Sequence, residues 1–176
     1  MMGCWAVSAN PSSNIRTLLT LKPQAKQLTP CITYLPEYPI THIGFNTLYA
    51  RQFLKIPNAS FNMFQKILTG PLGHKFMQDV RKAGRSLFVW TVNDEEMMKW
   101  SIRKEVDGVI TDDPKKYLEV CKDYDGKKPR MKWGTLGLIV FYQTMAFPLG
   151  FFLRWRFGYF VDAEKMKHIL EEARAG

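Results

Sequence analysis

Two short apolar runs that end in polar residues constrain the fold of this chain most. "SLFVWTVN" (residues 86–93) is followed by "DEEMMKW", and "DGVIT" (residues 107–111) is followed by "DDPKKYLEVCKDY". A continuous apolar run of this length is typical of a strand that is covered on both faces. A helix start follows each run, because Asn93 or Asp94 can cap the first helix and Pro114 suits the first turn of the second. Strands that alternate with helices indicate a parallel α/β fold.

Two further units precede these runs. "PITHIGFN" (residues 39–46) is predicted to be a strand, and the helical pattern "TLYARQFL" follows it. "NASFNMF" (residues 58–64) fits a strand, although "FNMFQKIL" also fits a helix. "GHKFMQDVRKAG" (residues 73–84) predicts a helix with Gly84 at its C-terminal cap. About four βα units are therefore expected, and open doubly wound sheets and closed barrels both satisfy this pattern.

Charge and cysteine content limit the classes of partner. The formal net charge of +9 favours an anionic partner, either nucleic acid or an acidic membrane surface. No recognition helix or base-stacking motif accompanies the charge, so we expect no nucleic-acid binding. The three cysteines (Cys4, Cys31 and Cys121) are far apart and odd in number, which predicts reduced thiols in a cytosol-facing chain.

The tail of the chain has a different composition. Residues 133–153, "WGTLGLIVFYQTMAFPLGFFL", form a run of 21 residues without a formal charge, and basic residues stand on both sides of it. A helix of that length spans roughly 30 Å, the thickness of the hydrocarbon core of a bilayer. Trp133 and Trp155 stand where interfacial aromatic residues are favoured. We predict a membrane anchor, which Pro148 allows to be a spanning helix or a shallow hairpin; a buried core helix is the alternative.

The expected organisation has five parts. These are an irregular leader (1–36), a partial βα barrel (37–124), a basic linker (125–132), the membrane anchor (133–153) and a short charged C-terminal helix (154–176). The leader is broken by prolines and carries no acidic residue, a composition that also fits a weak mitochondrial presequence.

The two strand motifs resemble those of a known family. "LFVWTVND" followed by "VDGVITDDP" is similar to the seventh and eighth strands of the glycerophosphodiester phosphodiesterase barrel. "ITHIGFNTLYARQFL" and "SFNMFQKILTGPLGHKF" resemble its fifth and sixth units, so the likeness covers about residues 28–124. It is greatest to the fungal, membrane-anchored branch that acts as a phosphatidylglycerol-directed phospholipase C. The resemblance implies the C-terminal half of a TIM-type barrel, followed by a hydrophobic anchor helix.

The resemblance also implies a substrate pocket. In such barrels the active site lies at the C-terminal ends of the strands. Trp90 would form an apolar wall against the glycerol part of the substrate, and Asn93 and Asp112 would lie at the pocket rim. Other roles are open for each residue, since a strand tryptophan is often a core residue and Asn93, Asp112 and Asp113 can cap helices.

The catalytic groups of the family are not found in this chain. The resemblance implies a divalent cation such as Mg²⁺ or Ca²⁺ held by carboxylates, and two histidines that act as acid and base. These groups belong to H-R, E-x-D and H-D motifs of the first four strands; no H-R or H-D dipeptide occurs in this chain, and no acid pair precedes Glu37. We therefore expect no catalytic residue, no metal ligand and no activity from this chain alone, as in a truncated form of a longer protein.

These observations give two expected functions. The first is a membrane-anchored relative of phosphodiesterases and phospholipases C of glycerophospholipid metabolism, with anionic glycerophospholipid as its partner. The alternative is a non-catalytic interaction or regulatory module on a membrane, with self-association possible because a half-barrel leaves open sheet edges. The expected location is the cytosolic side of the endoplasmic reticulum, the mitochondrial outer membrane or the lipid droplet.

Overall fold

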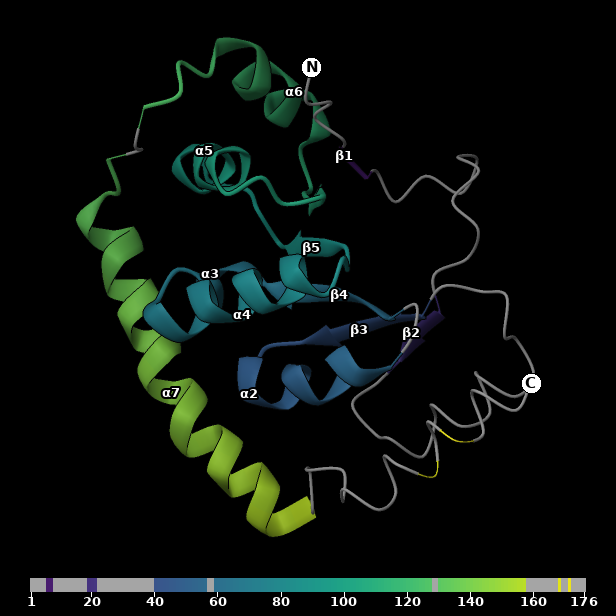
Figure 1. Cartoon of the computed structure of the whole chain (residues 1–176). Coiled ribbons are helices and arrows are strands. Elements are labelled where there is room, and N and C mark those ends of the chain that lie inside the picture. The colour runs from purple at the N-terminus through teal and green to yellow at the C-terminus, as the bar shows by residue number, and fades with distance from the viewer. Residues whose placement is uncertain are drawn as a thin grey trace.

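One parallel sheet organises the computed structural model (Figure 1), which describes residues 6–7, 19–21, 40–56, 59–127, 130–157, 168 and 171. Within these residues the strands are β1 (Ala6–Val7), β2 (Leu19–Leu21), β3 (Ile40–Gly44), β4 (Ala59–Phe64), β5 (Leu87–Trp90) and β6 (Gly108–Ile110). Their order in the sheet is β1-β6-β5-β4-β3-β2, and every neighbouring pair is parallel.

The four expected βα units are confirmed. The helices after β3 are α2 (Thr47–Ala50) and the 3₁₀ helix η2 (Arg51–Lys55); β4 is followed by α3 (Gln65–Leu68) and α4 (Pro71–Lys82); β5 is followed by α5 (Glu95–Arg103), and β6 by α6 (Pro114–Asp123). Each unit adds its strand on the same side of the preceding one, from β3 to β6. Because such crossovers are right-handed, this order keeps the helices on one face of the sheet, as in a part of a TIM-type barrel and unlike a doubly wound sheet.

The sequence around β4 fitted both a strand and a helix, and the structure contains one followed by the other. Residues of β4 alternate between buried and half-buried, the period of a strand with two different faces. Helix α3 begins directly after Phe64 and buries Ile67 and Leu68. The strand ends where the pattern changes from a period of two to a helical period.

Helix α4 ends as its sequence predicts. Gly84 has a positive φ of 64°, which a glycine adopts without strain. The Gly84 amide donates to the Arg81 carbonyl (2.9 Å) and the Arg85 amide donates to the Val80 carbonyl (3.1 Å). These two bonds form the Schellman arrangement that satisfies the last carbonyls of a helix.

The two faces of the sheet differ in burial, and here the prediction for β5 is wrong. Leu87 and Val89 are buried beneath the helices, whereas Phe88 and Trp90 on the other face are only half-buried. We expected β5 to be covered on both faces. A singly wound sheet has helices on its outer face only, so the inner face lacks a matching layer.

The leader also differs from expectation. It contributes β1 and β2, although residues 1–36 were predicted to be irregular. Ala6 pairs with Val109 of β6, so the first strand lies beside the last, as neighbours do where a barrel closes. Strands of two and three residues are too short to show a period, and for that reason the sequence pattern did not reveal them.

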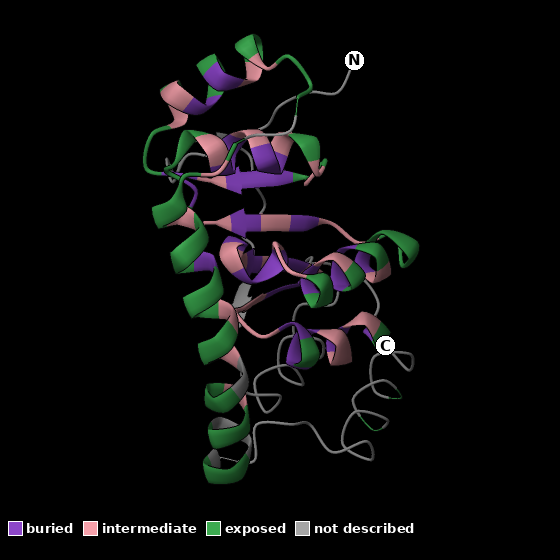
Figure 2. Ribbon diagram, turned by 90° about the vertical axis from the view of Figure 1, so that its left-hand side faces the viewer, coloured by how far each residue is buried: buried purple, intermediate pink, exposed green. Residues whose placement is uncertain are grey.

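Helix α7 (Trp133–Phe157) is the predicted apolar helix, four residues longer than expected and continuous through Pro148. By length and composition, Trp133–Phe152 could cross a membrane, which is weak support for an anchor. Only 6% of its most apolar window is buried, so α7 is not a buried core helix (Figure 2). The predicted C-terminal helix 154–176 lies largely outside the described residues.

His42 belongs to the core between β3 and its helices. Its side chain is 3% exposed, and its ring stacks on that of Phe53 with 4.3 Å between centroids. Burial lowers the pKa of His42 from 6.5 to about 4, because the charged imidazolium loses its hydration. His42 is therefore a neutral core residue.

We predict that His42 makes folding sensitive to mild acid. Between about pH 6.5 and pH 4 the unfolded chain binds a proton at His42 and the folded chain does not. The free energy of unfolding should therefore be highest above pH 6.5 and fall by about 1.4 kcal/mol for each pH unit down to about pH 4, where this contribution levels off. In urea unfolding, His42→Leu should remove this part of the pH dependence, and an unchanged slope in the variant would contradict it.

Candidate functional site

The C-terminal ends of the parallel strands bring polar residues of different units to one edge of the sheet, which we call the C-terminal edge. Asn93 follows β5, and Thr111, Asp112 and Asp113 follow β6. Because β5 and β6 are neighbours in the sheet, these two polar segments lie side by side. The C-terminal edge is where βα barrels place their binding and catalytic groups.

Asn93 joins the two segments through its side-chain amide. Its Oδ1 accepts hydrogen bonds from the Thr111 hydroxyl and the Asp112 backbone amide, both at 3.1 Å. Its Nδ2 donates to Asp112 Oδ2 at 2.6 Å. The structure thus brings together two of the three predicted pocket residues, whose role in binding remains a prediction.

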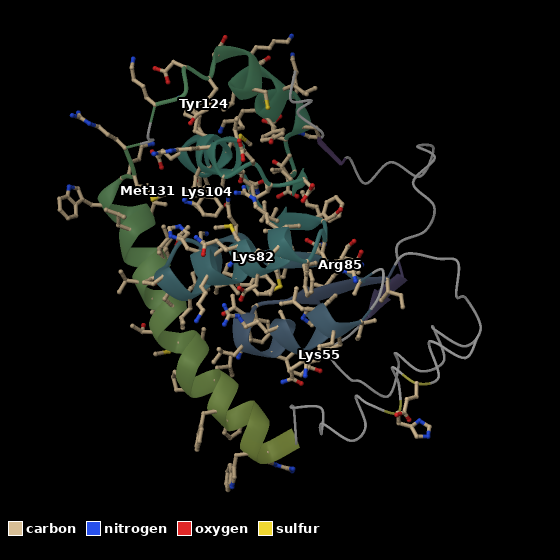
Figure 3. The ribbon with its side chains drawn as sticks, in the orientation of Figure 1. Lys55, Lys82, Arg85, Lys104, Tyr124 and Met131 are labelled. Atoms are coloured by element: carbon tan, nitrogen blue, oxygen red, sulfur yellow. The ribbon has the colours of Figure 1, made fainter. Side chains whose placement is uncertain are left out.

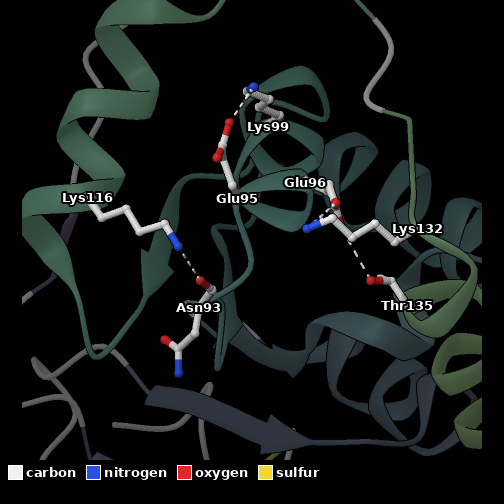
Figure 4. Close-up of polar contacts among 7 residues, drawn as sticks. All are labelled: Asn93, Glu95, Glu96, Lys99, Lys116, Lys132 and Thr135. Carbon is white, nitrogen blue, oxygen red and sulfur yellow. Dashed lines mark hydrogen bonds and ion pairs between the residues drawn. The ribbon is translucent and has the colours of Figure 1, made fainter.

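The helix caps fall on other residues. The Asp113 carboxylate accepts from the Lys116 amide at 3.0 Å and caps α6. Asp94 is the N-cap residue of α5 but makes no side-chain capping bond. The side chains of Asn93 and Asp112 are therefore left for the cross-loop contact, and Lys116 Nζ adds a bond to the Asn93 carbonyl at 3.3 Å (Figure 4).

Trp90, the third predicted pocket residue, lies in an aromatic row. Its indole Nε1 donates to the Asn62 carbonyl on β4 at 3.1 Å, and its ring is 5.3 Å from that of Phe64. Phe64 in turn is 5.0 Å from Tyr142 on α7, and the Lys66 ammonium stands 5.5 Å from the Tyr142 ring. The sequence analysis missed Phe64 and Tyr142 as neighbours of Trp90, because Phe64 lay in a segment that fitted a strand or a helix and Tyr142 lay in the predicted anchor.

A second polar group surrounds the start of α5, beside Asn93 (Figure 4). Glu95 and Lys99 form an ion pair at 2.6 Å, which lowers the pKa of Glu95 and raises that of Lys99. Glu96 contacts Lys132 at 3.4 Å and accepts from the Thr135 hydroxyl at 3.3 Å. These contacts connect the C-terminal edge to the start of α7.

Several basic residues lie away from this edge. Lys55, Lys82, Arg85 and Lys104 stand at or just beyond the C-terminal ends of η2, α4 and α5 (Figure 3). A positive charge at the C-terminal end of a helix is favourable to the helix dipole. Part of the net positive charge therefore stabilises the helices, and this part does not indicate an anionic partner.

The carboxylates at this edge do not form a metal site. Within the part of the chain that the structure describes, no group of three or more histidine, cysteine, aspartate and glutamate side chains could hold a metal ion. Asp112 is bonded to Asn93 and Asp113 caps a helix, so neither is arranged with other acids around a common point. A divalent cation therefore does not fit the described carboxylates at this edge.

Comparison with known proteins gives one match. A model of the Glycerophosphoryl diester phosphodiesterase family matches residues 7–116, more than half of the chain. The match begins at β1, well before the predicted limit of residue 28, and it ends in the first turn of α6. No curated protein and no solved structure shows a significant match.

We predict that Asn93 controls the order of the segment after β6. Asn93→Ala removes the acceptor of the Asp112 amide, a bond whose net contribution is about 1 kcal/mol. Hydrogen exchange at this amide, followed by nuclear magnetic resonance, should then speed up several-fold. Asp94→Ala, at a neighbouring side chain without a capping bond, should leave the rate unchanged. Equal rates in the two variants would contradict the proposed linkage.

Proposed function

The chain belongs to the glycerophosphoryl diester phosphodiesterase family, and from this we propose that it is a membrane-associated member that recognises glycerophospholipid at its C-terminal edge. The observation that carries the proposal is the Asn93–Asp112 contact, which joins the ends of β5 and β6 within the matched region. These are the ends that carry the "WTVN" and "GVITDDP" motifs. Barrel enzymes bind their substrates at such ends.

The proposed pocket combines one apolar wall with two polar groups. Trp90 offers a half-buried aromatic face suited to the glycerol and first acyl carbons of a lipid. Asn93 and Asp112 are exposed and offer hydrogen bonds to glycerol hydroxyl groups. Lys116, bonded to the Asn93 carbonyl, adds a positive charge beside these groups that suits the phosphate of such a lipid.

We propose that this chain alone does not hydrolyse the phosphodiester. In the family a divalent cation such as Mg²⁺ or Ca²⁺ supports the attack on phosphorus. The described carboxylates do not fit such a cation, and the H-R and H-D motifs are absent from the sequence. The chain would then contribute substrate binding, with the catalytic half of the barrel absent from it.

The order of the motifs allows the strands to be assigned to positions in the family barrel. We propose that β3 to β6 correspond to the fifth to eighth strands of the barrel, since the two most specific motifs end β5 and β6. The apolar α7, which follows the matched region after α6 and a short linker, supports the membrane-anchored phosphatidylglycerol phospholipase C branch. Lys127, Arg130 and Lys132 before α7 favour an anionic, cytosol-facing lipid surface. A basic residue near such a surface contributes about 1 kcal/mol, and Lys127 and Lys132 contribute less because they pair with Asp125 and Glu96. No contact among the described residues favours the alternative of a non-catalytic regulatory module.

The pocket can be tested with glycerophosphoglycerol, the water-soluble deacylated form of phosphatidylglycerol. We predict that the chain binds it and that Trp90→Ala weakens the affinity on the order of tenfold, because an apolar wall worth roughly 1–2 kcal/mol is lost. Isothermal titration calorimetry measures this. Asn93→Ala should also weaken binding, whereas Trp133→Ala, at a residue 90% exposed on α7, should not. Equal affinities in all three variants would exclude this pocket.

The absence of hydrolysis can be tested directly. The purified chain, supplied with phosphatidylglycerol and Mg²⁺ or Ca²⁺, should release no diacylglycerol or glycerol phosphate above the rate without protein. Thin-layer chromatography of labelled lipid follows the products. Metal-dependent release that a chelator abolishes would overturn the proposal.

A further inference from the structure

Helix α7 crosses the C-terminal edge and touches three successive βα units. Near its start, Thr135 donates to Glu96 after β5. In its middle, Gln143 Nε2 donates to Thr69 Oγ1 after β4 at 3.1 Å. Towards its end, Gly150 lies against Asn46 after β3. The helix thus follows the order of the strands along the edge (Figure 1).

The contact is a narrow stripe on one side of α7. Thr135, Ile139, Gln143, Ala146 and Gly150 recur every three or four residues and so share one face of the helix. Ile139 is only 7% exposed, and Ala146 packs against the core. These residues form the docked stripe.

Two glycines allow α7 to pack closely against the segments that follow the strands. A Cβ atom at Gly150 would lie 2.5 Å from the side-chain nitrogen of Asn46, and one at Gly70 would lie 2.7 Å from the amide of Gln143. Neither distance is possible without movement of a neighbour. Small residues at these points allow the helix backbone and the loops to meet.

The remaining faces of α7 are apolar and exposed (Figure 2). Trp133 and Trp155, near the two ends, are 90% and 77% exposed. Between them the exposed large apolar side chains are Leu136, Leu138, Val140, Phe141, Tyr142, Met145, Leu149, Phe151 and Phe152. A continuous apolar surface of this kind marks a membrane or protein interaction site.

The docked stripe is incompatible with a helix that crosses the bilayer. From Thr135 to Gly150 the helix rises about 22 Å, most of a hydrocarbon core of roughly 30 Å. Along that length α7 lies against a domain that carries Glu96 and Lys66. A charged domain cannot enter the core beside the helix without a large cost. Crossing, or bending into a hairpin at Pro148, would require α7 to leave the domain.

We propose that α7 stays docked and lies in the plane of the membrane interface, with its exposed apolar face among the acyl chains and the C-terminal edge above it. This inference rests on the proposed membrane association. A helix in the interface needs a polar side that faces water. Helix α7 has no polar face of its own, and the domain docked against it provides this polar surface. Lys132, Arg130 and Arg156 near the ends of the helix stand at the level of anionic head groups, and the end tryptophans suit the same depth.

An apolar cavity beside the docked stripe favours lipid over a protein partner. It has a volume of about 490 Å³ and lies between α7 and the starts of α2 and α4, with Leu48, Ile67, Leu72 and Phe151 in its wall. Small-molecule sites span roughly 300–1,000 Å³. Leu48, Leu72 and Phe151 are 44%, 40% and 74% exposed, so the cavity continues the apolar surface of α7 and can receive part of an acyl chain.

Cysteine cross-linking on vesicles tests the proposal. The full chain, with Cys4, Cys31 and Cys121 replaced by serine, carries Asn46→Cys and Gly150→Cys, whose side chains are adjacent only when α7 is docked. The chain is bound to vesicles of phosphatidylglycerol and phosphatidylcholine and then oxidised. We expect the disulfide to form as fully on vesicles as in detergent, and the oxidised chain to float with the vesicles as the reduced chain does. The pair Asn46→Cys and Phe152→Cys is the matched control, because Phe152 lies on the opposite side of α7 and should not cross-link.

Each other outcome overturns the proposal in a distinguishable way. Cross-linking in detergent but not on vesicles means that α7 leaves the domain to insert. Cross-linking in neither medium means that α7 is not docked. If neither the reduced nor the oxidised chain floats, the membrane association in the proposed function fails too. A fluorescent label at Phe141 should be quenched by brominated acyl chains, and a lack of quenching together with a dimeric mass would assign the apolar face to a second copy of the chain.

Discussion

The proposed function depends on one interaction. This is the packing of α7 across the C-terminal ends of β5, β4 and β3. All described strands are parallel, so the loops that follow them gather at one edge. Thr135, Gln143 and Gly150 contact the segments that follow three of these strands in turn. The segment that supplies an apolar surface and the segments that supply polar groups are therefore parts of one face of the molecule.

In the proposed function, this arrangement would connect glycerophospholipid recognition with the membrane. Asn93 and Asp112 hold the ends of β5 and β6 together, and Trp90 begins an aromatic row that reaches Tyr142 on α7. A lipid held at the surface by α7 would present its glycerophosphodiester group near this row. Among the described residues no group of three or more histidine, cysteine, aspartate and glutamate side chains could hold a metal ion, and for this reason the proposed role is lipid binding and not metal-assisted hydrolysis.

The sequence predicted those features that depend on local pattern. The four βα units and the end of α4 at Gly84 follow from periodicity and cap chemistry. The proximity of Asn93 and Asp112 agrees with the pocket rim that the family resemblance implied. It did not predict β1 and β2, because strands of two or three residues are stabilised by partners distant in the sequence. The half-exposed inner face of β5 was missed for a related reason, since an apolar run does not reveal whether a second layer exists. The contacts of α7 depend on small residues, Gly70 and Gly150, whose partners are far away in the chain.

Nuclear Overhauser effects between Tyr142 and Phe64 test the central claim, that α7 packs on the C-terminal edge, most directly. Their ring centroids are 5.0 Å apart, and Phe64 ends β4. In the chain bound to lipid nanodiscs, the account predicts cross-peaks between these two rings together with those between Phe64 and Trp90. Loss of the Tyr142–Phe64 cross-peaks while the Phe64–Trp90 cross-peaks persist would show an intact sheet without the docked helix, and would contradict the account.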